Sequence, residues 1–133
     1  MENIKYSYHF SLHLQFLNDI DVDKLENHFK IEAYKKTFLK DSKGSCKTAK
    51  LWYKSKDYTD VNTDIVIEKF IEKYFNNFRD LKNILEKNNG KATFTLYFTE
   101  VKERPIISLT QKTIDLFNKL GILFDVDFKR FPI

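Results

Sequence analysis

One amphipathic stretch, residues 64–87, constrains the fold more than any other part of the chain. Its large apolar residues recur at steps of three and four, which places them along one face of a helix. They are Ile67, Phe70, Ile71, Tyr74, Phe75, Phe78, Leu81 and Leu85. A single helix over this stretch would be roughly 35 Å long, with Thr63 as its N-cap, Gly90 in the left-handed turn after its end, and a bend at Asn76 and Asn77.

Four other segments alternate apolar and polar residues, which is typical of strands that bury one face. They are residues 6–16, 46–54, 91–100 and 122–128. In the first segment the even-numbered residues are all large and apolar, and His9 and His13 lie on the opposite, polar face. By the same alternation, Tyr97 lies on the polar face of the third segment, and Asp125 and Asp127 lie on that of the fourth.

Capping residues predict two shorter helices. Asp21 is a good N-cap for a helix that follows the first strand. Residues 108–111, Ser-Leu-Thr-Gln, form a capping box for a second helix, which Gly121 closes. Residues 31–45 show no clear period and collect Lys, Asp, Ser and Gly, so we expect a loop there.

The order of these elements predicts an α+β fold. We expect a four-stranded sheet, mostly antiparallel or mixed, with the long helix and the two shorter helices packed on one face. The 133 residues fit a single domain spanning residues 1–133. Because the chain contains 13 phenylalanines and 7 tyrosines, we expect a core built largely from aromatic rings.

The composition favours a soluble cytoplasmic protein. Cys46 is the single cysteine, so no disulfide can form within the chain. The N-terminal residues lack the basic region and apolar run of a signal peptide, and no apolar run is long enough to span a membrane.

Four local patterns spread over most of the chain carry a resemblance to a known family. They are the first alternating segment running into residues 21–25, the strand around residues 50–55, the long amphipathic helix, and Ser108-Leu109 followed by residues 120–128. The last pattern, a Leu-Gly helix end followed by an Asp-x-Asp strand, is the most specific. Together they resemble the domain-of-unknown-function family numbered 4279. The resemblance implies small bacterial domains with no known enzymatic activity, some of which are thought to be immunity proteins against toxins.

The residues that could carry chemistry do not form a recognisable catalytic or metal-binding motif. His9 and His13 would lie roughly 13 Å apart along their strand, too far to share one metal ion with bonds of about 2 Å. Asp125 and Asp127 could do acid–base work, bind a cation, contribute to an interface or simply be solvated. Cys46 has no catalytic signature around it, so we interpret it as a surface thiol. We therefore predict no enzyme activity, no catalytic residues, no metal and no cofactor.

The charge distribution is more informative. Residues 35–56 contain eight lysines and one acid, Asp41, for a local net charge of +7, which leaves −3 for the rest of the chain. Trp52 lies within this basic segment. Such a segment has three explanations: a solvated surface, a contact with an acidic protein, or a grip on single-stranded nucleic acid through phosphate attraction and base stacking.

We therefore predict a non-enzymatic bacterial binding protein, a monomer or homodimer without membrane association. The specific hypothesis is an immunity-type protein that neutralises a toxin or effector by direct protein–protein contact. The alternative is a nucleic-acid-binding accessory protein that uses the basic segment. The candidate contact residues lie either on the polar sheet face or in that segment: His9, His13, Tyr97, Asp125, Asp127, Lys40, Lys43, Lys47, Lys50 and Trp52.

Overall fold

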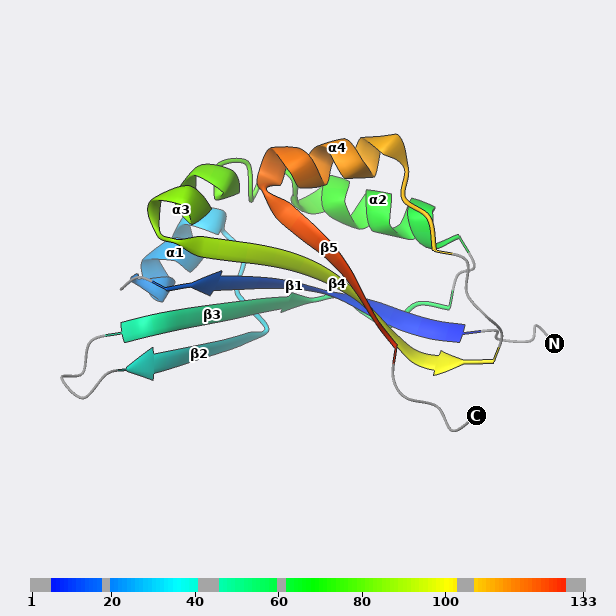
Figure 1. Cartoon of the computed structure of the whole chain (residues 1–133), viewed down its shortest axis with the longest axis horizontal. Helices are drawn as coiled ribbons and strands as arrows, with labels where there is room; N and C mark the ends of the chain where they lie inside the picture. Colours follow the sequence, from blue (N-terminus) through cyan, green and yellow to red (C-terminus); the bar gives the residue numbers. More distant parts are fainter. Residues whose placement is uncertain (1–5, 18–19, 41–45, 60–61, 103–106, 129–133) are drawn as a thin grey trace.

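The computed structural model describes residues 6–17, 20–40, 46–59, 62–102 and 107–128. Helices lie over one face of a five-stranded sheet (Figure 1). The elements in chain order are β1 (Tyr6–Phe16), α1 (Val22–Phe29), β2 (Lys35–Lys40), β3 (Cys46–Lys54), α2 (Thr63–Tyr74), α3 (Leu81–Lys87), β4 (Gly90–Val101), α4 (Gln111–Leu120) and β5 (Ile122–Phe128). The predicted α+β class is confirmed, with a mixed sheet. No helix in these ranges is long and apolar enough to cross a membrane.

The sheet has the order β2-β3-β1-β4-β5. The first three pairings are antiparallel, and β5 runs parallel to β4. Two parallel strands need a crossover connection, and here α4 lies between β4 and β5 in the chain and forms that connection. The four strands predicted from alternation are all present. β1, β3 and β4 each bury one face; on β5 Ile122 is buried, Phe124 and Val126 are half-buried, and Phe128 is exposed. The period of two could be read directly from the sequence.

The prediction of a loop over residues 31–45 is wrong in part, because residues 35–40 form a fifth strand, β2. This strand lies at the edge of the described sheet, where it pairs with β3. Lysines on an edge strand reduce its tendency to pair with other chains, and they also hide its alternation. The pairing with β3, which is a tertiary contact, is what makes this segment a strand.

The prediction of one long helix over residues 64–87 is also wrong in part, because this stretch forms two helices, α2 and α3. Residues 75–80 form turns between them. Here the side-chain amide of Asn77 donates a hydrogen bond of 2.8 Å to the carbonyl of Phe29, at the end of α1. The turns bring Phe78 into the core, with ring centroids 4.8 Å from Phe29 and 5.3 Å from Tyr53. The helix is therefore interrupted at the predicted bend, where Asn77 and Phe78 contact α1 and Phe78 also contacts β3.

The N-terminal caps follow the predictions in one case of three. Asp21 caps α1 by accepting a hydrogen bond from a backbone N–H in the first turn. In α4 the cap is Thr110, not the predicted Ser108. In α2 the predicted cap Thr63 is the first helical residue, and the capping position belongs to Asn62, whose side chain makes no capping hydrogen bond.

Gly90 and Gly121 act differently from one another. Gly121 ends α4 in the left-handed conformation with φ of 72°, as predicted. Gly90 does not occupy the left-handed turn after α3, which falls to Asn89 with φ of 52°. At Gly90 a β-carbon would lie 2.7 Å from the ring of Phe16 and 2.9 Å from Leu85. Glycine is needed there for a close approach, not for an unusual φ.

Aromatic rings fill the space between the sheet and the helices, as expected. The even-numbered residues of β1 from Tyr8 to Phe16 are all buried. Phe94 of β4 lies at the centre, with ring centroids 5.4 Å from Phe10, 5.8 Å from Phe70 and 5.2 Å from Phe117. These contacts join β1 and β4 to α2 and α4.

Candidate functional site

The candidate site is the face of the sheet opposite the helices, which we call the outer face. Within the described part of the chain, no helix lies on this side (Figure 1). Strand register assigns to it every second residue of each strand. The outer-face residues with described side chains are Lys35, Thr37, Thr48, Lys50, Trp52, Lys54, Ser7, His9, Ser11, His13, Gln15, Lys91, Thr93, Thr95, Tyr97, Thr99, Leu123, Asp125 and Asp127.

A stacked row of side chains crosses three strands of this face. Trp52 of β3 lies between Lys35 of β2 and His13 of β1 in the strand register. The Trp52 and His13 rings are nearly parallel, at 5° with centroids 4.7 Å apart. The Lys35 ammonium lies 5.3 Å from the centroid of the Trp52 ring. Since these neighbours belong to strands on either side of β3, the indole ring is flanked on both sides.

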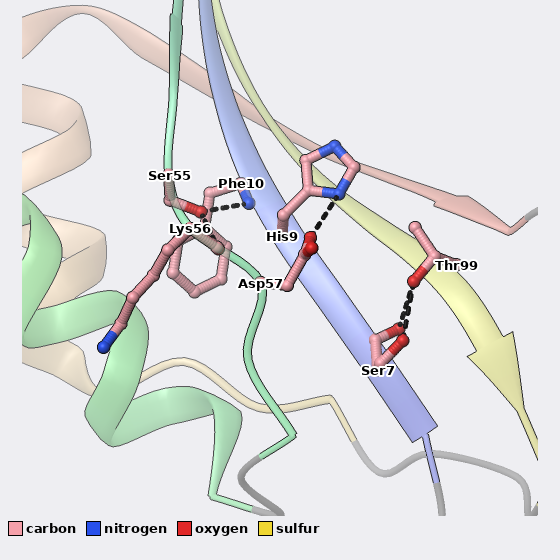
Figure 2. Close-up of polar contacts among 7 residues, drawn as sticks. All are labelled: Ser7, His9, Phe10, Ser55, Lys56, Asp57 and Thr99. Atoms are coloured by element: carbon pink, nitrogen blue, oxygen red, sulfur yellow. Dashed lines mark hydrogen bonds and ion pairs between the residues drawn. The ribbon is translucent and has the colours of Figure 1, made fainter.

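A second stack lies further along β1. The rings of His9 and Tyr97, paired across β1 and β4, lie 5.1 Å apart at 18°. His9 Nδ1 also faces the exposed carboxylate of Asp57 at 3.6 Å, as Figure 2 shows. Asp57 belongs to the segment after β3, and this segment runs alongside β1. There the Ser55 hydroxyl accepts a hydrogen bond of 2.8 Å from the backbone N–H of Phe10 (Figure 2). The segment thereby places a carboxylate beside the histidine.

Both histidines are half-buried, and the structure disfavours their charged forms. Burial is the main reason why the pKa of His13 is lowered, and the positive charges of Lys50 and Lys91 add to it. Burial also lowers the pKa of His9, with Lys54 adding to the effect and the Asp57 carboxylate partly opposing it. At neutral pH the centre of the outer face therefore carries two neutral imidazoles.

The net charge of the outer face changes sign from one edge of the sheet to the other. One cross-strand row runs from Lys54 of β3 through Ser11 and Thr95 to Asp125 of β5. The lysines gather mainly on β2 and β3, and the two aspartates lie on β5. The ends of this row are exposed, and the two short central side chains are buried among their neighbours. The face is therefore basic on one side, aromatic and neutral in the middle, and acidic on the other side.

The structure brings together most residues that the sequence singled out. Seven lie on the outer face: Lys50, Trp52, His9, His13, Tyr97, Asp125 and Asp127. Lys40 and Lys47 lie in β2 and β3, with side chains outside the described part, and Lys43 lies wholly outside the described residues. The sequence offered two separate candidate contact surfaces, the polar sheet face and the basic segment. In the structure they overlap, because the part of the basic segment in β2 and β3 belongs to the sheet.

Three lysines of the outer face, Lys35, Lys54 and Lys91, were not among the predicted contact residues. The alternation of residues 46–54 and 91–100 already placed Lys54 and Lys91 on the polar faces of their strands, so that signal was available. Lys35 could not be placed because β2 was not recognised as a strand.

Among the described residues, the aspartate pair belongs to no metal-binding cluster. Asp125 and Asp127 are both exposed, and Asp125 Oδ1 accepts a hydrogen bond of 2.9 Å from the backbone N–H of Val126. Among the described residues, no group of three His, Cys, Asp or Glu side chains could hold a metal ion together.

No family model matches the chain, and comparisons with curated proteins and with solved structures find no match. The resemblance to the family numbered 4279 therefore stays a hypothesis, and the function must be argued from the outer face.

Proposed function

We propose that this is a non-enzymatic binding protein whose outer face contacts a protein partner, in the manner of an immunity-type protein that neutralises a toxin or effector. The observation that carries the proposal is the graded outer face, basic at β2 and β3, aromatic at its centre and acidic at β5. A partner of matching chemistry presents acids opposite Lys35 and Lys54 and bases opposite Asp125 and Asp127.

The arrangement supports recognition of a protein for two reasons. Complementary charges raise the rate of encounter and fix the relative orientation of two proteins, and a face with both signs encodes an orientation that a uniform patch cannot. Aromatic residues in the middle of a surface, with charges at its rim, are also the usual composition of a protein interface. Trp52, His13 and Tyr97 occupy that middle position.

The alternative partner is single-stranded nucleic acid. Four lysines with described side chains lie on the outer face and favour it, and two of them lie over rings: Lys35 over Trp52 and Lys54 over Tyr34. Base stacking, however, needs a free ring face, and Trp52 is flanked on both sides. The acids of β5 would also repel a phosphate chain that crossed the sheet. These two features make us prefer a protein partner.

The test uses a double substitution that weakens the charge gradient without altering net charge. In Lys35→Glu/Asp125→Lys, both changed residues are exposed and lie on opposite sides of the outer face. The matched control is Lys119→Glu/Asp115→Lys, which exchanges the same charge types on exposed positions of α4. The wild-type chain is immobilised, proteins captured from nuclease-treated extract of the producing cell are identified and purified, and their affinities for the three chains are measured.

We expect a purified partner to bind the wild type and the control equally, and the outer-face variant more than about tenfold more weakly. The same partner should impair growth when expressed alone and not when expressed with this chain. If the partner binds the outer-face variant as tightly as the wild type, the outer face is not the contact. If only nucleic acid is retained, with affinity falling steeply as salt rises, the alternative function is correct.

A further inference from the structure

An open groove lies on the helix side of the sheet, between α2 and the segment that follows β3. We call it the basic groove, and its volume is about 620 Å³. Its apolar lining includes the half-buried rings of Tyr58, Phe70 and Tyr74. Exposed lysines line it as well, and among the described residues that line it none is acidic. The groove therefore combines aromatic side chains with positive charge of one sign.

Both walls of the basic groove are fixed by the fold. The backbones of Tyr58 and Tyr8 exchange two hydrogen bonds, of 2.7 and 2.9 Å, which hold the segment after β3 against β1. The Tyr58 ring on one wall and the Phe70 ring on the other have centroids 5.2 and 5.6 Å from that of the buried Phe10 ring. Because the two walls rest on the same core residue, the groove exists before any ligand arrives.

The acids beside the basic groove are directed away from it. On α2, Glu68 accepts a hydrogen bond from the hydroxyl of the residue that caps α4, and Glu72 forms an ion pair with a lysine of α4. On the other wall, Asp57 faces His9 of the outer face (Figure 2). Both walls thus direct their negative charges toward other parts of the molecule.

Three lysines remain on the groove. Lys69 and Lys73 lie four residues apart on α2, a spacing at which like charges repel each other. Lys56 extends toward α2 from the opposite wall (Figure 2). Its ammonium lies 5.2 Å from the centroid of the Tyr58 ring, and that of Lys73 lies 5.3 Å from the Tyr74 ring. None of the three forms an ion pair within the described part of the chain, so their charges are available to an anion.

We infer that the basic groove binds a small polyanion with two or more linked phosphate groups, with Lys56, Lys69 and Lys73 as its charge partners. Ammonium groups attract phosphate as point charges, and linked phosphates place several negative charges close together, as three lysines on one groove require. The volume lies within the range of about 300–1,000 Å³ that is usual for small-molecule sites. Inorganic tripolyphosphate and the triphosphate of a nucleotide share this chemistry, and a nucleotide would add contacts between its base and the apolar lining.

The test titrates tripolyphosphate and Mg²⁺-free ATP into the wild type at about 0.1 M salt, where charges more than roughly 10 Å apart are largely screened. Binding is measured by calorimetry and located by NMR shifts of backbone amides, which should move in residues 55–58 and 66–74. We expect saturable binding that is weakened about tenfold in Lys69→Gln/Lys73→Gln and about threefold in Lys56→Gln. The changed residues are all exposed, so these variants should fold.

The matched control is Lys87→Gln/Lys119→Gln, which removes the same charge from exposed positions of α3 and α4 and should bind as the wild type does. ATP binding more tightly than tripolyphosphate would identify a nucleotide as the ligand, and the reverse order would identify the phosphate chain alone. The inference is overturned if neither compound saturates, if the shifted amides lie elsewhere, if the control weakens binding as much as the groove variant, or if only a long single-stranded oligonucleotide binds.

The basic groove and the outer face adjoin at Lys54, which lines the groove and lies on the outer face by strand register. The groove variants therefore leave Lys54 unchanged. Lys35→Glu/Asp125→Lys should not alter the affinity for either phosphate compound, and Lys69→Gln/Lys73→Gln should not alter the affinity for the protein partner. Each proposal can thus fail without the other.

Discussion

The carboxylate of Glu26 in α1 accepts a hydrogen bond of 2.7 Å from the backbone N–H of Ala33, just before the edge strand β2. Its second oxygen lies 2.6 Å from the ammonium of Lys36, inside that strand. Burial alone would raise the pKa of Glu26, but the hydrogen bonds from Lys36 and Ala33 and the charge of Lys36 outweigh it and lower the pKa. One buried carboxylate therefore ties α1 to the edge of the sheet.

Removing this carboxylate should destabilise the protein. In Glu26→Ala the backbone N–H of Ala33 loses its acceptor, and we expect the free energy of unfolding to fall by about 1–3 kcal/mol. Glu26→Gln keeps an acceptor oxygen and should lose less. Urea denaturation measures both. Lys36→Met is the control that removes the cation and keeps the bond to Ala33. A midpoint for Glu26→Ala equal to that of the wild type would contradict this account.

The lowered pKa of His13 makes stability depend on pH. The unfolded chain takes up a proton near the ordinary value of 6.5, whereas the folded chain does so only at a lower pH. Below pH 6.5 the unfolded state therefore binds more protons, and the free energy of unfolding falls as the pH falls through this window. We expect His13→Gln to reduce that slope between about pH 7 and pH 5. Equilibrium unfolding at several pH values measures it.

His9 contributes to the same slope, so His13→Gln should reduce it in part and His9→Gln/His13→Gln should reduce it further. The matched control is Thr93→Val, which alters the neighbour of His13 on β4 and removes no titratable group. An unchanged slope in the double histidine variant would show that the two imidazoles titrate alike in the folded and unfolded chains.

Gly90→Ala should destabilise the protein through a steric clash. The new β-carbon would lie 2.7 Å from the Phe16 ring and 2.9 Å from Leu85, and overpacking of this kind costs about 1–3 kcal/mol. Adding Phe16→Leu removes the nearest obstacle, so the loss in the double variant should be smaller than the sum of the two single losses. Thermal unfolding measures this coupling, and strict additivity would argue against a direct clash.

Gly121→Ala should also destabilise, but for a conformational reason. The residue has φ of 72°, and a β-carbon in the left-handed region costs about 1–2 kcal/mol. The nearest atom to such a carbon is the flexible side chain of Lys82, at 3.2 Å, so crowding adds little. Gly121→Asn should recover part of the loss, because Asn tolerates this conformation better. Equal losses for Ala and Asn would contradict the conformational explanation.

The sequence alone determined the features whose signal is local. The alternation in β1, β3, β4 and β5 could be read because each strand carries large apolar residues on one face, and the period of two then appears in the residues themselves. The left-handed end of α4 at Gly121 was likewise visible, since glycine favours that conformation by itself. The assignment of His13, Trp52, Tyr97 and the Asp125–Asp127 pair to polar strand faces followed from the same alternation.

The tertiary structure decided the features that depend on partners distant in sequence. β2 is a strand because it pairs with β3, and residues 75–80 interrupt the predicted helix where Asn77 bonds to the end of α1. The strand order then placed Lys35, Trp52 and His13 in one row, uniting two surfaces that the sequence kept separate. A period reports which face of an element is buried, but not which neighbour covers it.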